Sequence, residues 1–68
     1  MVITVCLNNG EKVVVKEVFG MKGWFLMEIC YDGRSYTKVV FQCFFGRFWE
    51  LIRVFTSGAK PTNIFVPA

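Results

Sequence analysis

Side chains that perform catalysis are scarce in this chain of 68 residues. It contains no histidine, so the usual general base and the commonest metal ligand are both missing. The acidic residues are spread along the chain: Glu11, Glu17, Glu28, Asp32 and Glu50. Asp32 precedes a glycine, as turns favour, and Glu28 has a candidate cross-strand partner in Lys38. We therefore expect no catalytic site and no enzymatic activity.

The cysteines are the remaining candidates for a nucleophile or a metal site: Cys6, Cys30 and Cys43. No two of them have the short spacing that zinc sites use, and no base partner for a thiolate can be identified. Disulfide scaffolds of this length have an even and dense set of cysteines instead. We expect small buried side chains in a reducing cytoplasm. Because a glycine-rich phosphate loop is missing too, no metal, cofactor or small-molecule substrate is expected.

Basic and aromatic residues offer a different chemistry, the recognition of a surface. The candidates for contact with a partner or a nucleic acid are Lys12, Lys16, Trp24, Arg34, Tyr36 and Lys38. On an open sheet face, rings can stack on bases while cations follow the phosphates, as single-stranded nucleic-acid binders require. The net charge of +3 and the pI near 9.0 agree with that hypothesis. The alternative is that the lysines keep an exposed sheet soluble.

Two predicted hairpins position these residues, and the first consists of strands at 2–7 and 12–18. The Asn-Asn-Gly sequence at residues 8–10 between them is a strong hairpin signal. A three-residue loop with a glycine bulge gathers apolar side chains on one face, whereas a two-residue loop would mix lysines among them. The lysines of the second strand then share the other face with Val14.

The second predicted hairpin has strands at 24–30 and 35–42 around a three-residue loop at 31–33. This loop places Phe25 opposite Val39 on a largely apolar face. The other face carries Trp24, Leu26, Tyr36, Lys38 and Val40, with Arg34 at the hairpin tip. Across both hairpins, we expect three residues of that face to form the apolar centre of an interface with a charged rim: Val14, Leu26 and Val40.

The connection between the hairpins, residues 19–23, holds two glycines and breaks the strand pattern. We expect Phe19 to cap the core and Met21 to have no special role. The alternative is that both side chains anchor a partner.

Residues 44–56 have a pattern that fits either a helix or a strand. At helical spacing the apolar side chains gather on one arc: Phe44, Phe45, Phe48, Trp49, Leu51, Ile52 and Phe55. A strand period of two would leave charge on both faces, so we predict a helix that stops at Ser57 and Gly58. A short strand at 63–66 follows. The alternative is an SH3-like all-β barrel with residues 47–55 as its fifth strand.

The predicted fold class is α+β, in a single domain of residues 1–68. It consists of a four-stranded antiparallel sheet of two hairpins, one amphipathic helix packed on one face, and the short C-terminal strand. Hydrophobic residues make up 54% of the 68 positions, or about 37 residues. A two-layer domain of this size has only roughly 20–25 inward-facing positions. Apolar surface should therefore remain exposed, which indicates a homo-oligomer or a protein partner.

The leading functional hypothesis is a non-catalytic protein-interaction, inhibitor or regulatory module of the size that viruses and mobile elements encode. A single-stranded nucleic-acid-binding module is the second hypothesis. The third is a subunit whose exposed strands assemble into a ring or filament.

No stretch of the sequence predicts a membrane partner. The central uncharged run, residues 39–46, is far shorter than the roughly 20 residues of a spanning helix. The apolar residues at 2–7 follow Met1 without the basic segment of a signal peptide. We expect a cytoplasmic protein.

Overall fold

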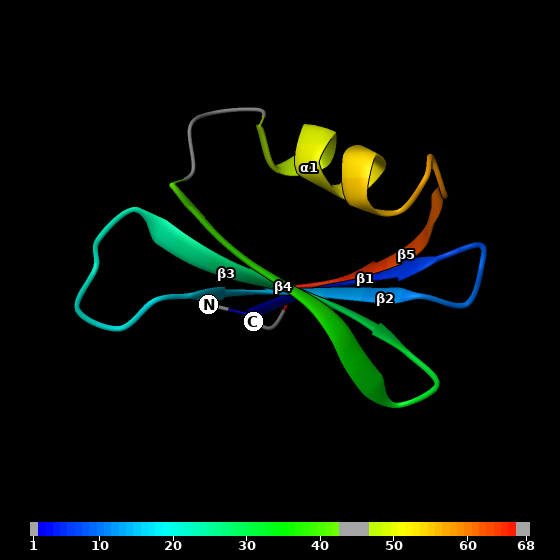
Figure 1. The fold of residues 1–68 in the computed structure, drawn as a ribbon, viewed down its shortest axis with the longest axis horizontal. Coiled ribbons are helices and arrows are strands. Elements are labelled where there is room, and N and C mark those ends of the chain that lie inside the picture. The colour runs from blue at the N-terminus through cyan, green and yellow to red at the C-terminus, as the bar shows by residue number, and fades with distance from the viewer. Residues whose placement is uncertain (1, 43–46, 67–68) are drawn as a thin grey trace.

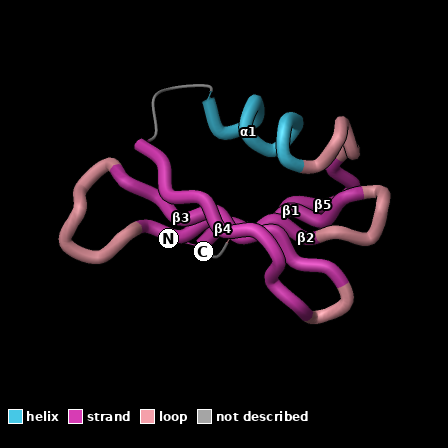
Figure 2. Tube along the Cα trace, viewed as in Figure 1, coloured by secondary structure: helices cyan, strands magenta, loops and turns pink. Residues whose placement is uncertain are grey.

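Five antiparallel strands and one short helix form the fold in the computed structural model, which describes residues 2–42 and 47–66 (Figure 1). In chain order the elements are β1 (Val2–Leu7), β2 (Lys12–Glu17), β3 (Trp24–Tyr31), β4 (Arg34–Gln42), α1 (Arg47–Phe55) and β5 (Pro61–Phe65). The strands pair in the order β4-β3-β2-β1-β5, so β4 and β5 are the two edges of one sheet. Figure 2 shows the sheet as one layer and α1 as a second layer over it.

The sheet has five strands rather than the four predicted, because β5 pairs with β1. Ile64 lies opposite Val5 in this added pair. The backbone N–H of Asn8 donates to the Lys60 carbonyl at 2.8 Å, and the Asn8 side-chain oxygen accepts from the Lys60 N–H at 3.1 Å. These bonds hold the start of β5 beside the first hairpin. The strand begins at Pro61, two residues before the predicted start, and an edge strand tolerates a proline there.

The first hairpin has the predicted register. Val5 lies opposite Val13, and the Leu7 N–H donates to the Glu11 carbonyl at 2.8 Å, which closes a three-residue loop. Gly10, the last residue of that loop, has a φ of 90°, in the region that favours glycine. The Asn-Asn-Gly signal therefore predicted both the loop and the faces of β1 and β2.

The loop of the second hairpin is shorter than predicted. Tyr31 lies opposite Arg34, so the loop contains two residues rather than three. These residues, Asp32 and Gly33, both have a positive φ, of 53° and 77°. A type I′ turn requires that conformation, and its twist matches that of the two strands it joins.

A bulge in β4 compensates for the shorter loop. Ile29 lies opposite Thr37 but Cys30 lies opposite Ser35, which leaves Tyr36 as an extra residue. Further along, Phe25 pairs with Phe41 rather than with the predicted Val39. Beyond the bulge the slide is two residues, one from the loop and one from the bulge, so the side chains from Tyr36 to Gln42 stay on their predicted faces. Ser35, which the predicted register places opposite Ile29, instead lies opposite Cys30 on the other face.

Residues 47–55 are helical, so the prediction of an SH3-like barrel with a strand at this position is wrong. Three residues of the predicted helix, Phe44, Phe45 and Gly46, lie outside the described residues, as does Cys43. The helix ends as predicted: the Gly58 N–H donates to the Arg53 carbonyl at 3.1 Å, and Ser57 has a φ of 54°. No helix in the described ranges is long and apolar enough to cross a membrane.

The core lies between α1 and one face of the sheet, which we call the inner face. The buried apolar side chains are Val5, Leu7, Val13, Val15, Met27, Ile29, Phe41 and Ile52. The helix contributes Ile52 and the half-buried Leu51, whereas Trp49 and Phe55 on the predicted apolar arc are 43% and 41% exposed. A nine-residue helix is roughly 14 Å long, and five strands span roughly 24 Å, so α1 covers the inner face incompletely.

Candidate interaction surface

The face of the sheet opposite α1 is called the outer face, and no element of the described part of the chain lies over it (Figure 1). The strand pairings, with alternation along β4 for the unpaired Tyr36, assign seventeen residues to it: Val2, Thr4, Cys6, Lys12, Val14, Lys16, Trp24, Leu26, Glu28, Cys30, Ser35, Tyr36, Lys38, Val40, Gln42, Asn63 and Phe65. It therefore includes eight of the nine residues predicted for partner or nucleic-acid contact. The ninth, Arg34, is exposed at the hairpin tip opposite Tyr31.

A row of three apolar residues and one lysine crosses four strands of the outer face. Lys16 lies opposite Val2 on one side and Leu26 on the other, and Leu26 lies opposite Val40. Leu26 is half-buried, whereas Val40 is 55% exposed at the sheet edge. Val14, also half-buried, belongs to the adjacent row. The three residues predicted as an apolar interface centre are therefore neighbours on one surface.

Charged side chains alternate with these apolar ones. The Lys16 Nζ lies 3.8 Å from the Glu28 Oε1, and Lys38 lies opposite Glu28 on β4. The ion pair therefore forms with Lys16 rather than with the predicted Lys38. Lys12 adds a third exposed lysine, so the outer face has three lysines and one glutamate. A partly exposed pair of this kind is worth about 0–1 kcal/mol, so its effect on folding is small.

The two aromatic candidates for base stacking are far apart on the outer face. Trp24 lies opposite Gln42, and Tyr36 is six residues further along β4. At about 3.3 Å per residue, this separation is roughly 20 Å. Trp24 is half-buried and Tyr36 is 55% exposed. The structure thus places both rings on the same face without forming one continuous stacking platform.

The connection between β2 and β3 is a loop of two successive turns. The Met21 N–H donates to the Val18 carbonyl at 3.1 Å, and the Trp24 N–H donates to the Met21 carbonyl at 3.0 Å. Gly20 and Gly23, each the third residue of its turn, have φ values of 79° and 85°. A type II turn requires a positive φ there, which explains both glycines. We call residues 18–24 the double-turn loop.

The expectation that Phe19 caps the core is wrong. Its side chain is 101% exposed on the double-turn loop, and Met21 beside it is 46% exposed. The two turns direct residue 19 away from the sheet. The spacing of glycines at 20 and 23 was the signal for this geometry, since both turns need a positive φ at those positions.

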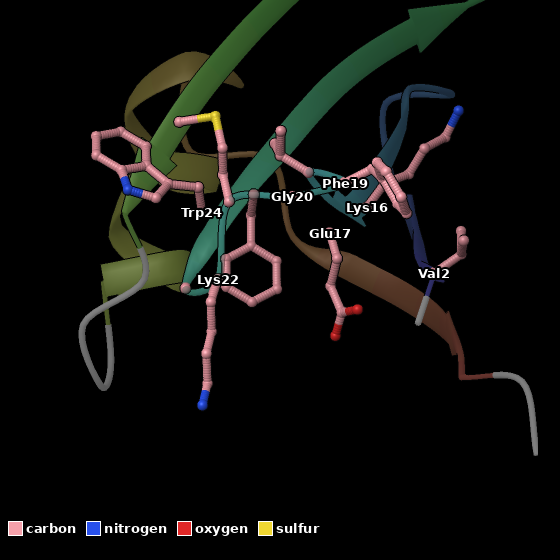
Figure 3. A pocket seen from close by; sticks show the side chains of 11 residues that line it. Val2, Lys16, Glu17, Phe19, Gly20, Lys22 and Trp24 are labelled. Atoms are coloured by element: carbon pink, nitrogen blue, oxygen red, sulfur yellow. The ribbon is translucent and has the colours of Figure 1, made fainter.

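An open hollow lies between the double-turn loop and the adjacent strand ends, with a volume of about 710 Å³. Figure 3 shows its lining side chains, with Trp24 and Val2 at opposite ends and Glu17 and Lys22 extending toward the same side. Three of its lining residues, Val2, Lys16 and Trp24, also belong to the outer face. The hollow and the outer face therefore form one continuous surface.

The two cysteines of the described residues lie on the outer face rather than in the core. Cys6 and Cys30 flank Lys12 on the neighbouring strands, and both are half-buried with free thiols. The expectation that they are buried is wrong, because their alternation matches that of the lysines. Within the described ranges, no group of three His, Cys, Asp or Glu residues could hold a metal ion.

No protein-family model, curated protein or solved structure matches this chain.

Proposed function

We propose that this protein is a non-catalytic interaction module that self-associates through its outer face and acts as an inhibitor or regulator by surface contact. The observation that carries the proposal is the group of neighbouring apolar residues Val14, Leu26 and Val40 on a sheet face that α1 does not cover. A contiguous apolar patch on a small protein marks an interface, whereas single exposed apolar residues need no explanation.

A second copy of the chain is the occupant that we favour, because the surface is large enough for a stable dimer. Such an interface buries about 800 Å² per partner, which is about a sixth of the chain's accessible surface of 5013 Å². Five strands of about six residues present a flat area of roughly 24 by 20 Å, and their side chains enlarge it. A contact over the whole outer face would therefore bury the area that a stable dimer needs.

The charge of the outer face predicts how salt affects this association. With three lysines and one glutamate on each copy, two facing copies repel each other weakly, and dissolved salt screens that repulsion. Self-association should therefore hold or strengthen between about 50 and about 500 mM salt. Nucleic-acid binding would instead weaken steeply over the same range.

Two exposed valines provide a matched test. Val40 lies on the outer face and is 55% exposed, whereas Val54 lies on α1 and is 73% exposed. Val40→Glu should raise the dimer dissociation constant at least about tenfold, because it replaces an apolar side chain of the contact with a carboxylate that must lose its hydration there. Val54→Glu should change it less than about twofold. Sedimentation analysis across a concentration series measures both.

A wild-type protein that stays monomeric at every concentration would overturn self-association. Equal effects of the two glutamates would show that the contact lies elsewhere.

Single-stranded nucleic-acid binding is the second candidate, and three exposed lysines on one face favour it: Lys12, Lys16 and Lys38. It predicts tight binding at low salt and a loss of affinity for Trp24→Ala or Tyr36→Ala, because each ring would stack on a base. Fluorescence anisotropy with a labelled oligonucleotide measures this affinity. A flat titration at low salt would remove this candidate.

A further inference from the structure

The double-turn loop holds the backbone around its projecting aromatic residue, Phe19, in a defined conformation. Three backbone hydrogen bonds of 3.0–3.1 Å close it: the bond within each turn, and one from the Val18 N–H to the Trp24 carbonyl. Phe19 is fully exposed, so burying it in a partner would remove roughly 150–250 Å² from water. A large apolar side chain on a pre-organised loop is typical of an interface anchor, because little conformational entropy is lost when it binds.

The same loop borders a hollow that is large enough for a second aromatic ring. Its volume is about 710 Å³ and it is open to solvent, so a ring of a second molecule can reach it. The lining includes Val2, Val18, Trp24 and Phe25, and so offers apolar contacts to a ring. Phe19 also borders this hollow, so a projecting group and a receiving site lie on one patch (Figure 3).

A patch that carries both a projecting group and a receiving site is self-complementary. In a twofold-symmetric contact each copy presents the same patch, so the projection of one must fit the hollow of the other. We infer that the Phe19 side chain of each copy enters the hollow beside the double-turn loop of a second copy. This inference rests on the proposed self-association and assigns its anchor.

The area of the contact supports a second copy as the occupant. Phe19 alone provides about a quarter of the roughly 800 Å² that a standard interface buries per partner. Val2, Lys16 and Trp24 continue the surface onto the outer face, which supplies the remainder.

A photo-crosslinking experiment tests the position of the ring directly. Phe19 is replaced by p-benzoylphenylalanine, which is also aromatic, and the variant is mixed with an equal amount of ¹⁵N-labelled variant before irradiation. We expect mixed-isotope crosslinks from position 19 to peptides that contain Val2, Lys16 or Trp24. Crosslinks confined to a single copy, or to α1 of the second copy, would overturn the inference.

Substitution of the same residue separates this inference from the proposed function. Phe19→Ala should raise the dimer dissociation constant at least about tenfold, with an unchanged circular dichroism spectrum because the side chain is fully exposed. Val54→Ala on α1 is the control and should have no effect. An unchanged dimer in Phe19→Ala, with a weakened one in Val40→Glu, overturns the anchor and leaves the outer-face contact standing.

A monomeric wild type would instead contradict both ideas. In that case, sedimentation with vesicles of phosphatidylcholine and phosphatidylserine tests an anionic lipid surface as the occupant instead. Vesicle binding that Phe19→Ala abolishes would assign the loop to a membrane surface and overturn the contact between copies.

Discussion

The two faces of the sheet are built from the same strands and differ in what covers them. On β3, Met27 and Ile29 point to the inner face and are completely buried. Leu26 on the same strand points to the outer face and is half-buried. Both faces carry aliphatic side chains, so composition alone does not separate them. The difference is that one short helix can cover only one face, and it covers the face without lysines.

The outer face shows how a small protein keeps apolar surface in water. Its lysines alternate with the apolar side chains, and the aliphatic part of a lysine can cover neighbouring apolar atoms while its amine stays solvated. Lys16 illustrates this arrangement, because it lies between Val2 and Leu26 in one row. Such an alternation hydrates a face that still carries apolar side chains, and under our proposal those side chains contact the second copy.

The largest expected effect is the difference in unfolding free energy between truncating an aliphatic side chain on the inner face and truncating one on the outer face. Ile29→Ala should lower the free energy of unfolding by about 2–5 kcal/mol, because it leaves a cavity in the core. Leu26→Ala, three residues earlier on the other face, should lower it by less than about 1.5 kcal/mol. Urea denaturation at low protein concentration measures both. Equal losses would mean that the outer face is covered within a single copy.

A smaller loss of unfolding free energy is expected from a substitution in the loop at residues 8–10, which sets the register of β1 and β2. Gly10→Ala should lower the free energy of unfolding by about 1–2 kcal/mol, because Gly10 has a φ of 90°. A Cβ at residue 10 would also lie 3.3 Å from the Tyr31 Cε2. Gly20→Ala is the matched control, since it has a φ of 79° and no atom near its Cβ. The difference between their unfolding free energies measures the Tyr31 contact, and a zero difference would show that Tyr31 moves aside freely.

The smallest effect should come from the ion pair on the outer face. Glu28→Gln should change the free energy of unfolding of the monomer by less than about 1 kcal/mol, because the pair with Lys16 is partly solvated. A double-mutant cycle with Lys16→Met isolates the interaction energy. A coupling well above 1 kcal/mol would mean that the outer face is stabilised by its charges rather than left available for a partner.

Local signals in the sequence predicted the hairpins well. The Asn-Asn-Gly loop at residues 8–10 was identified correctly, together with the register of β1 and β2. The loop after β3 was predicted one residue too long, because Tyr31 was assigned to the loop although it pairs with Arg34. The bulge at Tyr36 has no strong sequence signal; it preserves the predicted faces from Tyr36 to Gln42 but not that of Ser35.

The candidate surface was predicted in part. The outer-face residues followed from alternation, but the exposure of Phe19 did not, because hydrophobicity alone favours burial. The separation of Trp24 from Tyr36 was underestimated, because the predicted register places Trp24 opposite Val40, two residues nearer to Tyr36 than the observed partner Gln42.

By itself, the sequence determined which side chains share a face, where the first hairpin turns and where the helix ends. These features depend on alternation and on turn and cap preferences, which act over a few residues. The tertiary structure decided that β5 joins the sheet beside β1, that α1 leaves much of the apolar surface uncovered, and that the double-turn loop borders a hollow. These depend on contacts such as that between Asn8 and Lys60, which are distant in sequence and form only when the whole chain packs.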